Sequence, residues 1–211
     1  MVKWVNMRNA NLIKRLDELT SGLEIGRVYR ARELAPFSSS LGRDLKLLVE
    51  NKKLRLVGKG LYVRPDKFGD FEVPPDSREV ISKFLGTNHF ILRSRSDYNR
   101  LGLGLTQMFN EVFVYNKKRF GKIKLDGKVY FFKRRDFPRS NHFEYLFVDL
   151  FNNIDSVGAD KKILMERFEY AWRNRAWDCN YEVIYKFTQK YGKNWVKKYF
   201  QKLEGKEHVS S

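Results

Sequence analysis

The sequence predicts an α+β protein in which short helices and β-hairpins come first and a helical region comes last. Three observations support this prediction. Apolar residues recur at helical spacing near the start of the chain and again after residue 140. Two turns rich in glycine, Gly58-Lys59-Gly60 and Asp126-Gly127, accompany short β-like runs. A chain of 211 residues with 42% hydrophobic and 15% aromatic residues can bury a sizeable core.

The first segment, Met1–Pro65, has the order helix, short helix, helix, hairpin. Pro36 ends the short helix, because a residue before proline is pushed out of the helical region. This order is that of a winged helix-turn-helix, in which the third helix enters the major groove of DNA. The predicted elements are helices over Asn9–Thr20, Ala31–Leu34 and Leu41–Asn51, and extended pieces over Arg27–Tyr29, Leu54–Val57 and Leu61–Val63.

The chain is predicted to divide into a winged helix-turn-helix domain (residues 1–66), a linker (67–76) marked by Gly69 and Pro74-Pro75, a central small α/β domain with β-hairpins (77–139) and C-terminal helices (140–211). The central domain is expected to contain a helix, a strand, a helical turn and two further strands, over Ser77–Leu85, Phe90–Leu92, Ser96–Leu101, Val112–Asn116 and Lys128–Arg134. The final helices are expected over Phe143–Phe151, Lys161–Trp177, Tyr181–Tyr191 and Asn194–Leu203.

The charge of the chain indicates an acidic partner. The formal net charge of +17 comes from 42 Lys and Arg against 25 Asp and Glu. It is distributed as +8 over Met1–Pro65, −3 over Asp66–Asp76, +10 over Ser77–Arg139 and +2 over Ser140–Ser211. Nucleic acid is the commonest partner of so basic a protein. A membrane surface is the alternative. No apolar run approaches the ~20 residues that span a bilayer, and the basic run lacks the long amphipathic helix that would lie in an interface, so no membrane partner is expected.

The candidate DNA contacts are short polar and cationic side chains on the third helix and the hairpin. The helix N-terminus also favours phosphate through its dipole. The alternative is that these are ordinary solvated charges, or that the winged helix binds protein. The predicted contacts to double-stranded DNA are Ser38, Ser39, Ser40, Arg43, Lys46, Lys53, Arg55, Lys59 and Arg64.

A second basic run follows in the central domain, interspersed with aromatic residues. On alternating strand positions such charges would share one face and could bind further DNA or an RNA. A solvated strand face over a packed aromatic face is the equally favoured alternative. The predicted surface comprises Lys117, Lys118, Arg119, Lys122, Lys124, Lys133, Arg134 and Arg135.

No spacing of an enzyme, a metal site or a cofactor site is recognised, so we expect neither catalysis nor a bound cofactor. His89 with Asp97, and His142 with Glu144, are loose pairs, and a nuclease would need carboxylates such as Asp97, Glu111 and Asp126. Cys179 is the only cysteine, which excludes an intrachain disulfide and fits a reducing compartment. Early basic residues interrupt any signal-peptide core, so a cytoplasmic protein is expected.

Several stretches of the chain resemble AbiEi-family antitoxins of type IV toxin–antitoxin systems. Gly26–Tyr29, Ser39–Asn51 and Lys53–Pro65 resemble the winged helix of that family; Leu101–Gln107, Glu111–Tyr115, Gly121–Ile123 and Gly127–Arg134 resemble the domain that follows it. The resemblance rests on the order and spacing of several motifs from about Leu12 to Arg135. The doubled Leu103-Gly104 and the aromatic tail depart from the family pattern.

The resemblance implies a DNA-binding antitoxin that represses its own operon through the winged helix. The second domain would counteract a partner toxin of nucleotidyltransferase type without a stable protein complex. Two alternatives remain: a protein-interaction module that uses the winged helix and the tail, or a nucleic-acid-processing enzyme. The aromatic residues of the tail are spaced for core packing or for a dimer interface, and a homodimer would suit a repressor that reads two half-sites.

Overall fold

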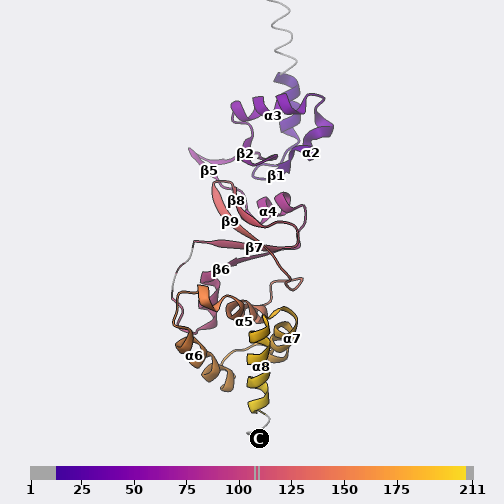
Figure 1. The fold of residues 1–211 in the computed structure, drawn as a ribbon. Helices are drawn as coiled ribbons and strands as arrows, with labels where there is room; N and C mark the ends of the chain where they lie inside the picture. Colours follow the sequence, from indigo (N-terminus) through magenta and orange to yellow (C-terminus); the bar gives the residue numbers. More distant parts are fainter. Residues whose placement is uncertain (1–12, 107, 109, 208–211) are drawn as a thin grey trace, which may run out of the picture. The chain divides into compact units, whose positions relative to one another are not determined.

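The computed structural model describes residues 13–106, 108 and 110–207. The chain forms two compact units. The first comprises Met1–Asn88 with Lys122–Val129, and the second comprises His89–Gly121 with Tyr130–Ser211. Each contains helices and small β-sheets (Figure 1), so the mixed α+β class predicted from the sequence is confirmed.

The first unit starts with a helix over residues 13–21. Strand β1 (Val28–Arg30), helix α2 (Ala31–Leu34), the 3-10 turn η1 (Ala35–Phe37) and helix α3 (Leu41–Glu50) follow. Strands β2 (Arg55–Gly58) and β3 (Leu61–Val63) then form a hairpin. These strands make an antiparallel sheet in the order β1-β3-β2, in which Val63 lies opposite both Val28 and Arg55. The predicted elements are therefore present, with ends shifted by a residue or two; the predicted start of the first helix lies outside the described residues.

Leucines hold these elements together. Leu16 and Leu19 of the first helix pack against Leu45 and Leu48 of α3, and Leu54 before β2 joins the same cluster. All five are nearly fully buried. Each such side chain contributes roughly 1.5–3 kcal/mol relative to remaining exposed. The spacing that buries this stripe of α3 turns its other face toward solvent.

The structure corrects the prediction that residues 67–76 form a linker. Residues 66–73 form an antiparallel hairpin, β4 (Asp66–Phe68) and β5 (Phe71–Val73), with Gly69 in the left-handed conformation at its turn. Helix α4 (Ser77–Leu85) follows, capped by the Asp76 carboxylate, which accepts a hydrogen bond from the Arg78 main-chain N–H.

Helix α4 belongs to the first unit, whereas the sequence placed it in the central domain. The Glu79 carboxylate accepts a hydrogen bond from the Val28 N–H and lies 3.5 Å from the Arg27 guanidinium. Lys83 pairs with Glu33 of α2 at 2.7 Å. These partners are far from α4 along the chain, so the predicted boundary at residues 67–76 does not follow the division into compact units.

The second unit contains β6 (Ile91–Ser94), the 3-10 helix η2 (Arg95–Leu101) and β7 (Val112–Asn116), and shares with the first the hairpin β8 (Gly121–Leu125) and β9 (Lys128–Arg134). The sheet order is β6-β7-β9-β8; β6 and β7 are antiparallel, and β7 and β9 are parallel. Asp126 and Gly127 both have positive φ, as the predicted tight turn requires. Strand β8 was not among the predicted elements.

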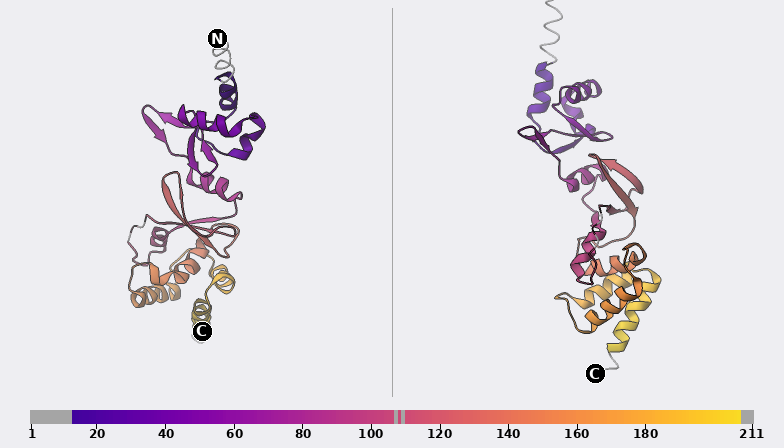
Figure 2. Two further views of the ribbon diagram at one scale, coloured as in Figure 1. Left: turned by 45° about the horizontal axis from the view of Figure 1, so that its top comes forward. Right: turned by 90° about the vertical axis from the view of Figure 1, so that its left-hand side faces the viewer.

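The rest of the second unit is helical, as predicted (Figure 2). Helix α6 ends at Arg173, four residues before the predicted end, because Arg175 has positive φ and cannot continue a helix. Asp160 and Asn180 cap α6 and α7 with their side chains. The elements are α5 (Phe143–Asn152), η3 (Ile154–Ser156), α6 (Lys161–Arg173), α7 (Tyr181–Tyr191) and α8 (Asn194–Glu207).

The aromatic residues of the tail form the core of this unit. Trp172 and Phe200 are fully buried and pack edge to face with ring centroids 5.3 Å apart. Phe168 lies among Phe147, Phe151 and both of these rings. Core packing, one of the two predicted roles of the tail, is confirmed.

Candidate nucleic-acid interface

The exposed face of α3 carries hydroxyl and cationic side chains. Ser39 and Ser40 precede the helix, and Arg43 and Lys46 follow at intervals of three residues from Ser40, so they lie on one side. All four are exposed. Lys46 Nζ lies 3.9 Å from the Glu50 carboxylate one turn further along the helix. Because this pair is solvent-exposed, it holds Lys46 weakly and leaves it available to another anion.

Asp44, also on α3, is fully buried. Its carboxylate lies 2.6 Å from the Arg15 guanidinium and accepts a hydrogen bond of 2.5 Å from the Ser38 hydroxyl. Burial by itself would raise the pKa of Asp44, but the hydrogen bonds from Ser38 and Arg15 outweigh it and lower the pKa. The negative charge in the first half of α3 is therefore neutralised inside the fold.

The three serines before α3 have different roles. The Ser38 hydroxyl is committed, because besides donating to Asp44 it accepts the Ser40 main-chain N–H at 3.0 Å. Ser40 occupies the N-cap position but makes no side-chain capping bond. Ser39 and Ser40 are thus the two predicted serines whose hydroxyls face solvent.

Lys59 lies at the tip of the β2–β3 hairpin and is exposed. Gly60 after it has a φ of 69°, and its carbonyl accepts the Ala31 N–H at 2.9 Å at the start of α2. The hairpin is short, and this bond fixes its tip beside α2. Lys59 can therefore contact a nucleic-acid backbone only where that backbone passes close to α2.

Arg55 and Arg64, two of the predicted DNA contacts, have partners within the fold. The Arg55 guanidinium pairs with Glu72 and with Asp126. Burial lowers its pKa, but these two carboxylates raise it further than burial lowers it. Arg64 donates to the main-chain carbonyls of Thr20 at 3.0 Å and Leu23 at 2.5 Å, and so satisfies the end of the first helix.

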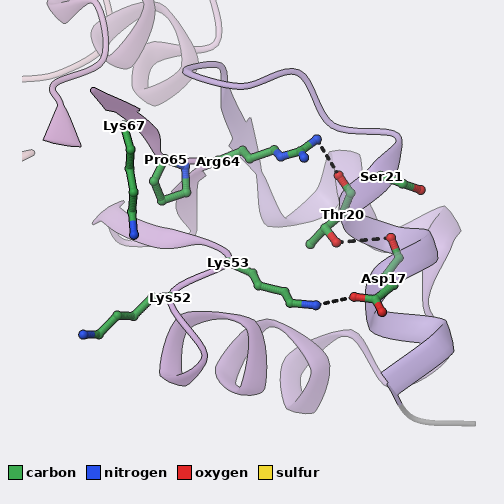
Figure 3. A pocket seen from close by; sticks show the side chains of 8 residues that line it. All are labelled: Asp17, Thr20, Ser21, Lys52, Lys53, Arg64, Pro65 and Lys67. Atoms are coloured by element: carbon green, nitrogen blue, oxygen red, sulfur yellow. Dashed lines mark hydrogen bonds and ion pairs between the residues drawn. The ribbon is translucent and has the colours of Figure 1, made fainter. Parts of the chain in front are cut away.

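Lys53 lies beside Arg64 in a pocket of about 430 Å³. Figure 3 shows Lys53 directed at the Asp17 carboxylate, with which it forms an ion pair, and Arg64 directed at the main chain of Thr20. Figure 3 draws no hydrogen bond or ion pair between Lys52 or Lys67 and the other residues that line the pocket. The pocket is lined by Asp17, Thr20, Ser21, Lys52, Lys53, Arg64, Pro65 and Lys67.

The second predicted basic surface is divided, so the expectation that its charges share one face is wrong. Lys117, Lys118 and Arg119 lie exposed in the loop after β7, where Lys117 pairs with Asp136. Lys122 and Lys124 are exposed on β8, in the part of the chain that belongs to the first unit. At the end of β9, Arg134 is exposed, while Lys133 before it and Arg135, the first residue after the strand, are half-buried.

Arg135 belongs to a buried cluster around Asp149 of α5, which the sequence analysis did not identify. The Asp149 carboxylate is fully buried and lies 3.1 Å from the Arg93 guanidinium and 3.4 Å from that of Arg135. The Tyr98 and Tyr115 hydroxyls donate to it at 3.0 and 3.3 Å. Burial, followed by the charge of Asp149, raises the pKa of both tyrosines, so they remain protonated donors.

Lys133 lies near this cluster and is influenced by the charge of Asp149. Its Nζ is 4.1 Å from the centroid of the Phe113 ring, a cation–π arrangement. Burial, and then the nearby charge of Arg135, lower the pKa of Lys133. Arg95, which pairs with Glu111 at 2.5 Å, lies over the same ring. The cations of this sheet face mainly support the fold.

The residues considered for catalysis are dispersed. Asp97 accepts the Ser94 N–H and lies near Arg93, Glu111 pairs with Arg95, and Asp126 pairs with Arg55 of the first unit. His89 packs on Phe137, while the His142 ring meets the Ser140 hydroxyl and Glu144 accepts the Asn180 N–H. Burial raises the pKa of Cys179 to about 11. Within residues 13–106, 108 and 110–207, no group of three or more His, Cys, Asp or Glu could hold a metal ion.

No family model, curated protein or solved structure matches this chain. The resemblance to AbiEi-family antitoxins therefore stays a prediction. Among the described helices, none is both long and apolar enough to cross a membrane. The exposed face of α3, with Ser39, Ser40, Arg43 and Lys46, is the surface whose geometry best supports a functional proposal.

Proposed function

We propose that the first unit is a winged helix-turn-helix that binds double-stranded DNA, and that the protein represses its own operon as an antitoxin. Helix α3 would enter the major groove, and Lys59 would contact the neighbouring backbone. The contacts would be made by Ser39, Ser40, Arg43, Lys46 and Lys59. Arg55 is left out of this interface, because its charge is paired with Glu72 and Asp126. Arg64 is left out because it lies with Lys53 in the pocket at the other end of α3.

The observation that carries the proposal is the distribution of charge on α3. A groove-reading helix must present donors and cations to phosphates and base edges, and must not present an acid. Asp44 is buried and paired with Arg15, so over residues 41–46 of α3 the exposed charges are Arg43 and Lys46, and no carboxylate is exposed. Glu50, the other acid of α3, lies at its far end.

The arrangement of elements supports the same proposal. A helix, a short strand, two helices joined by a tight turn and a hairpin follow one another, and the strands pair in the order β1-β3-β2. This is the order expected of a winged helix, in which the first strand pairs with the second strand of the wing. Docking of α3 in a groove would place Lys59 and α2 near the phosphates.

The antitoxin part of the proposal rests on the resemblance to the AbiEi family. The second unit would counteract a nucleotidyltransferase-type toxin, and the exposed loop with Lys117, Lys118 and Arg119 is its most basic accessible segment. The half-buried Lys133 and Arg135 are less suitable, because Arg135 pairs with Asp149.

The test is binding of the purified protein to its own upstream DNA and to a scrambled duplex across a salt series. We expect tighter binding to the upstream duplex at every salt concentration. Arg43→Ala should weaken upstream binding by roughly five- to a hundredfold, the range for loss of a base contact. Lys59→Ala should weaken both duplexes alike and reduce the slope of log affinity against log salt by about 0.9.

The matched control is Lys198→Ala with Lys202→Ala, which removes exposed charge from α8. It should leave the preference for upstream DNA unchanged. Urea unfolding of each variant checks that the fold is intact. Equal affinity for both duplexes would reject the repressor, and full affinity in both Arg43→Ala and Lys59→Ala would reject this interface.

A further inference from the structure

The pocket of Figure 3 lies at the end of α3 opposite to the proposed DNA-reading residues. Ser39 and Ser40 stand before the first residue of α3, and Lys52 and Lys53 follow its last. A helix of ten residues is about 15 Å long. The pocket is therefore a feature separate from the groove-reading end of α3.

The pocket has a surplus of positive charge. Four of its lining residues are cationic, Lys52, Lys53, Arg64 and Lys67, and one, Asp17, is acidic. Asp17 neutralises Lys53, and Arg64 spends one nitrogen on the carbonyls of Thr20 and Leu23. The remaining N–H groups of Arg64 and the amines of Lys52 and Lys67 are available to an anion that accepts several hydrogen bonds.

Lys52 occupies a backbone position that a lysine does not favour. Its φ is 55°, in the left-handed region, where glycine is the usual residue. The Lys52 N–H bonds to the Val49 carbonyl at 3.0 Å and the Lys53 N–H to that of Leu48 at 2.9 Å, the pattern that ends a helix with such a residue. Strained residues of this kind cluster where a side chain has a task. Lys52 is one of the residues that line the pocket.

We propose that this pocket binds a phosphate group. A phosphate carries up to two charges and has several acceptor oxygens, so it suits a pocket lined by four cations and one acid better than a carboxylate does. The group has two sources: a backbone phosphate of bound DNA, or a free phosphate. The proposal does not depend on the DNA-binding role of α3, because the free anion is tested without DNA.

The first experiment measures the thermal midpoint of the full chain in inorganic phosphate and in sodium chloride of equal ionic strength. Phosphate should raise the midpoint of the wild-type protein more than chloride does, because a ligand that binds the folded state stabilises it. Lys52→Gly should raise the midpoint without phosphate, since glycine relieves the backbone strain, yet lower phosphate affinity roughly fivefold. Lys67→Ala should lower phosphate affinity similarly.

If Lys52 only ended the helix, Lys52→Gly would raise the thermal midpoint without changing phosphate affinity. A higher midpoint together with weaker phosphate binding identifies Lys52 as part of a ligand site. The control is Lys14→Ala, an exposed lysine of the same unit that does not line the pocket. Its phosphate response should match that of the wild type. A phosphate response that persists undiminished in both Lys52→Gly and Lys67→Ala overturns the pocket as its site.

The second experiment identifies the source of the phosphate. In the salt series with DNA, the double variant Lys52→Gly with Lys67→Ala should lose about 0.9 in slope for each phosphate contact if the pocket holds the DNA backbone. An unchanged slope with a specific response to inorganic phosphate supports the free anion. No specific response to phosphate together with an unchanged slope overturns the proposal, whether or not α3 binds DNA.

Discussion

Two aspartates are among the most buried side chains of the described residues, although nothing in the sequence distinguishes them from solvated acids. Asp44 and Asp149 are both fully inaccessible, and each is paired with arginine. A buried ion pair contributes little net stability, but removal of one partner strands the other charge. Both residues are therefore sensitive positions in their units.

We expect Asp44→Ala to reduce the free energy of unfolding by about 2–4 kcal/mol, somewhat below the 3–5 kcal/mol of a fully buried pair, because Arg15 can still reach water. Urea denaturation at neutral pH measures it. Glu50→Ala, which removes an exposed carboxylate from the same helix, should cost less than about 1 kcal/mol. Equal losses in the two variants would contradict a structural role for Asp44.

The contribution of Asp44 should also depend on pH. Folding lowers the pKa of its carboxyl, so its stabilisation is fully present above the unfolded value of about 3.9 and is lost as the pH falls through the folded value. The stability difference between wild type and Asp44→Asn should therefore narrow below about pH 3.9. Urea titrations from neutral pH to pH 3 test this; a difference that widens toward acid would show the opposite sign.

Among the helices and strands, α5 connects the sheet of the second unit to its aromatic core. Asp149 on α5 faces Arg93 of β6 and Tyr115 of β7, while Phe147 and Phe151 of α5 pack on Phe168 of α6. One helix therefore carries a polar contact on one side and an apolar contact on another. Its position explains why almost every side chain of α5 is buried.

We expect Asp149→Ala to lower the free energy of unfolding by about 3–5 kcal/mol, because Arg93 is itself buried and would lose its carboxylate. Guanidinium denaturation followed by tryptophan fluorescence reports on this unit, since Trp172 lies in its core. Asp155→Ala, which removes an exposed partner of Lys161, is the matched control and should have little effect. A cost below about 1 kcal/mol for Asp149→Ala would contradict the role assigned to the cluster.

The junction of α7 and α8 depends on Gly192. A Cβ at this position would lie 2.5 Å from the Thr188 carbonyl oxygen, which already accepts the Gly192 N–H at 2.8 Å. Gly192→Ala should therefore destabilise the protein by about 1–3 kcal/mol through backbone displacement. Thermal unfolding of both variants measures the effect. Gly205→Ala, where a Cβ would meet nothing, should leave the stability unchanged or raise it slightly. The reverse order of the two variants would contradict this reading of the junction.

For the complete chain, a net charge of +17 favours non-specific attraction to nucleic acid, so specificity for an operator would require a small number of placed side chains. If the first unit reads DNA, charges of the second unit should alter neither the preference for upstream DNA nor the response to Arg43→Ala. The exposed loop after β7 offers the sharpest comparison, because it concentrates three basic residues.

We expect Lys118→Ala with Arg119→Ala to preserve the ratio of upstream to scrambled binding, while toxin neutralisation in a growth assay falls. Competition binding at fixed salt measures the ratio. Arg43→Ala should show the reverse pattern: a lower binding ratio and retained neutralisation. Loss of the binding ratio in the loop variant would reject the proposed division between the two units.

The amphipathic pattern was enough to predict most helices and several strands. Helices Ala31–Leu34, Ser77–Leu85 and Tyr181–Tyr191 and strands Val112–Asn116 and Lys128–Arg134 have the predicted bounds, because local spacing, caps and breakers determine where such elements begin and end. The hairpin β4–β5 was missed because each of its strands has only three residues and lies close to acids, Gly69 and Pro74-Pro75, a composition that is typical of a linker.

The sequence alone determined the α+β class, the order of elements and the basic character of the chain, since these follow from composition and short-range periodicity. Which charges remain exposed was decided by tertiary structure. Arg64, Arg135 and Asp44 are indistinguishable by spacing from solvated residues, yet each is held by a partner far away in the chain. Burial and ion pairing depend on contacts between distant segments, and one-dimensional patterns carry no information about those contacts.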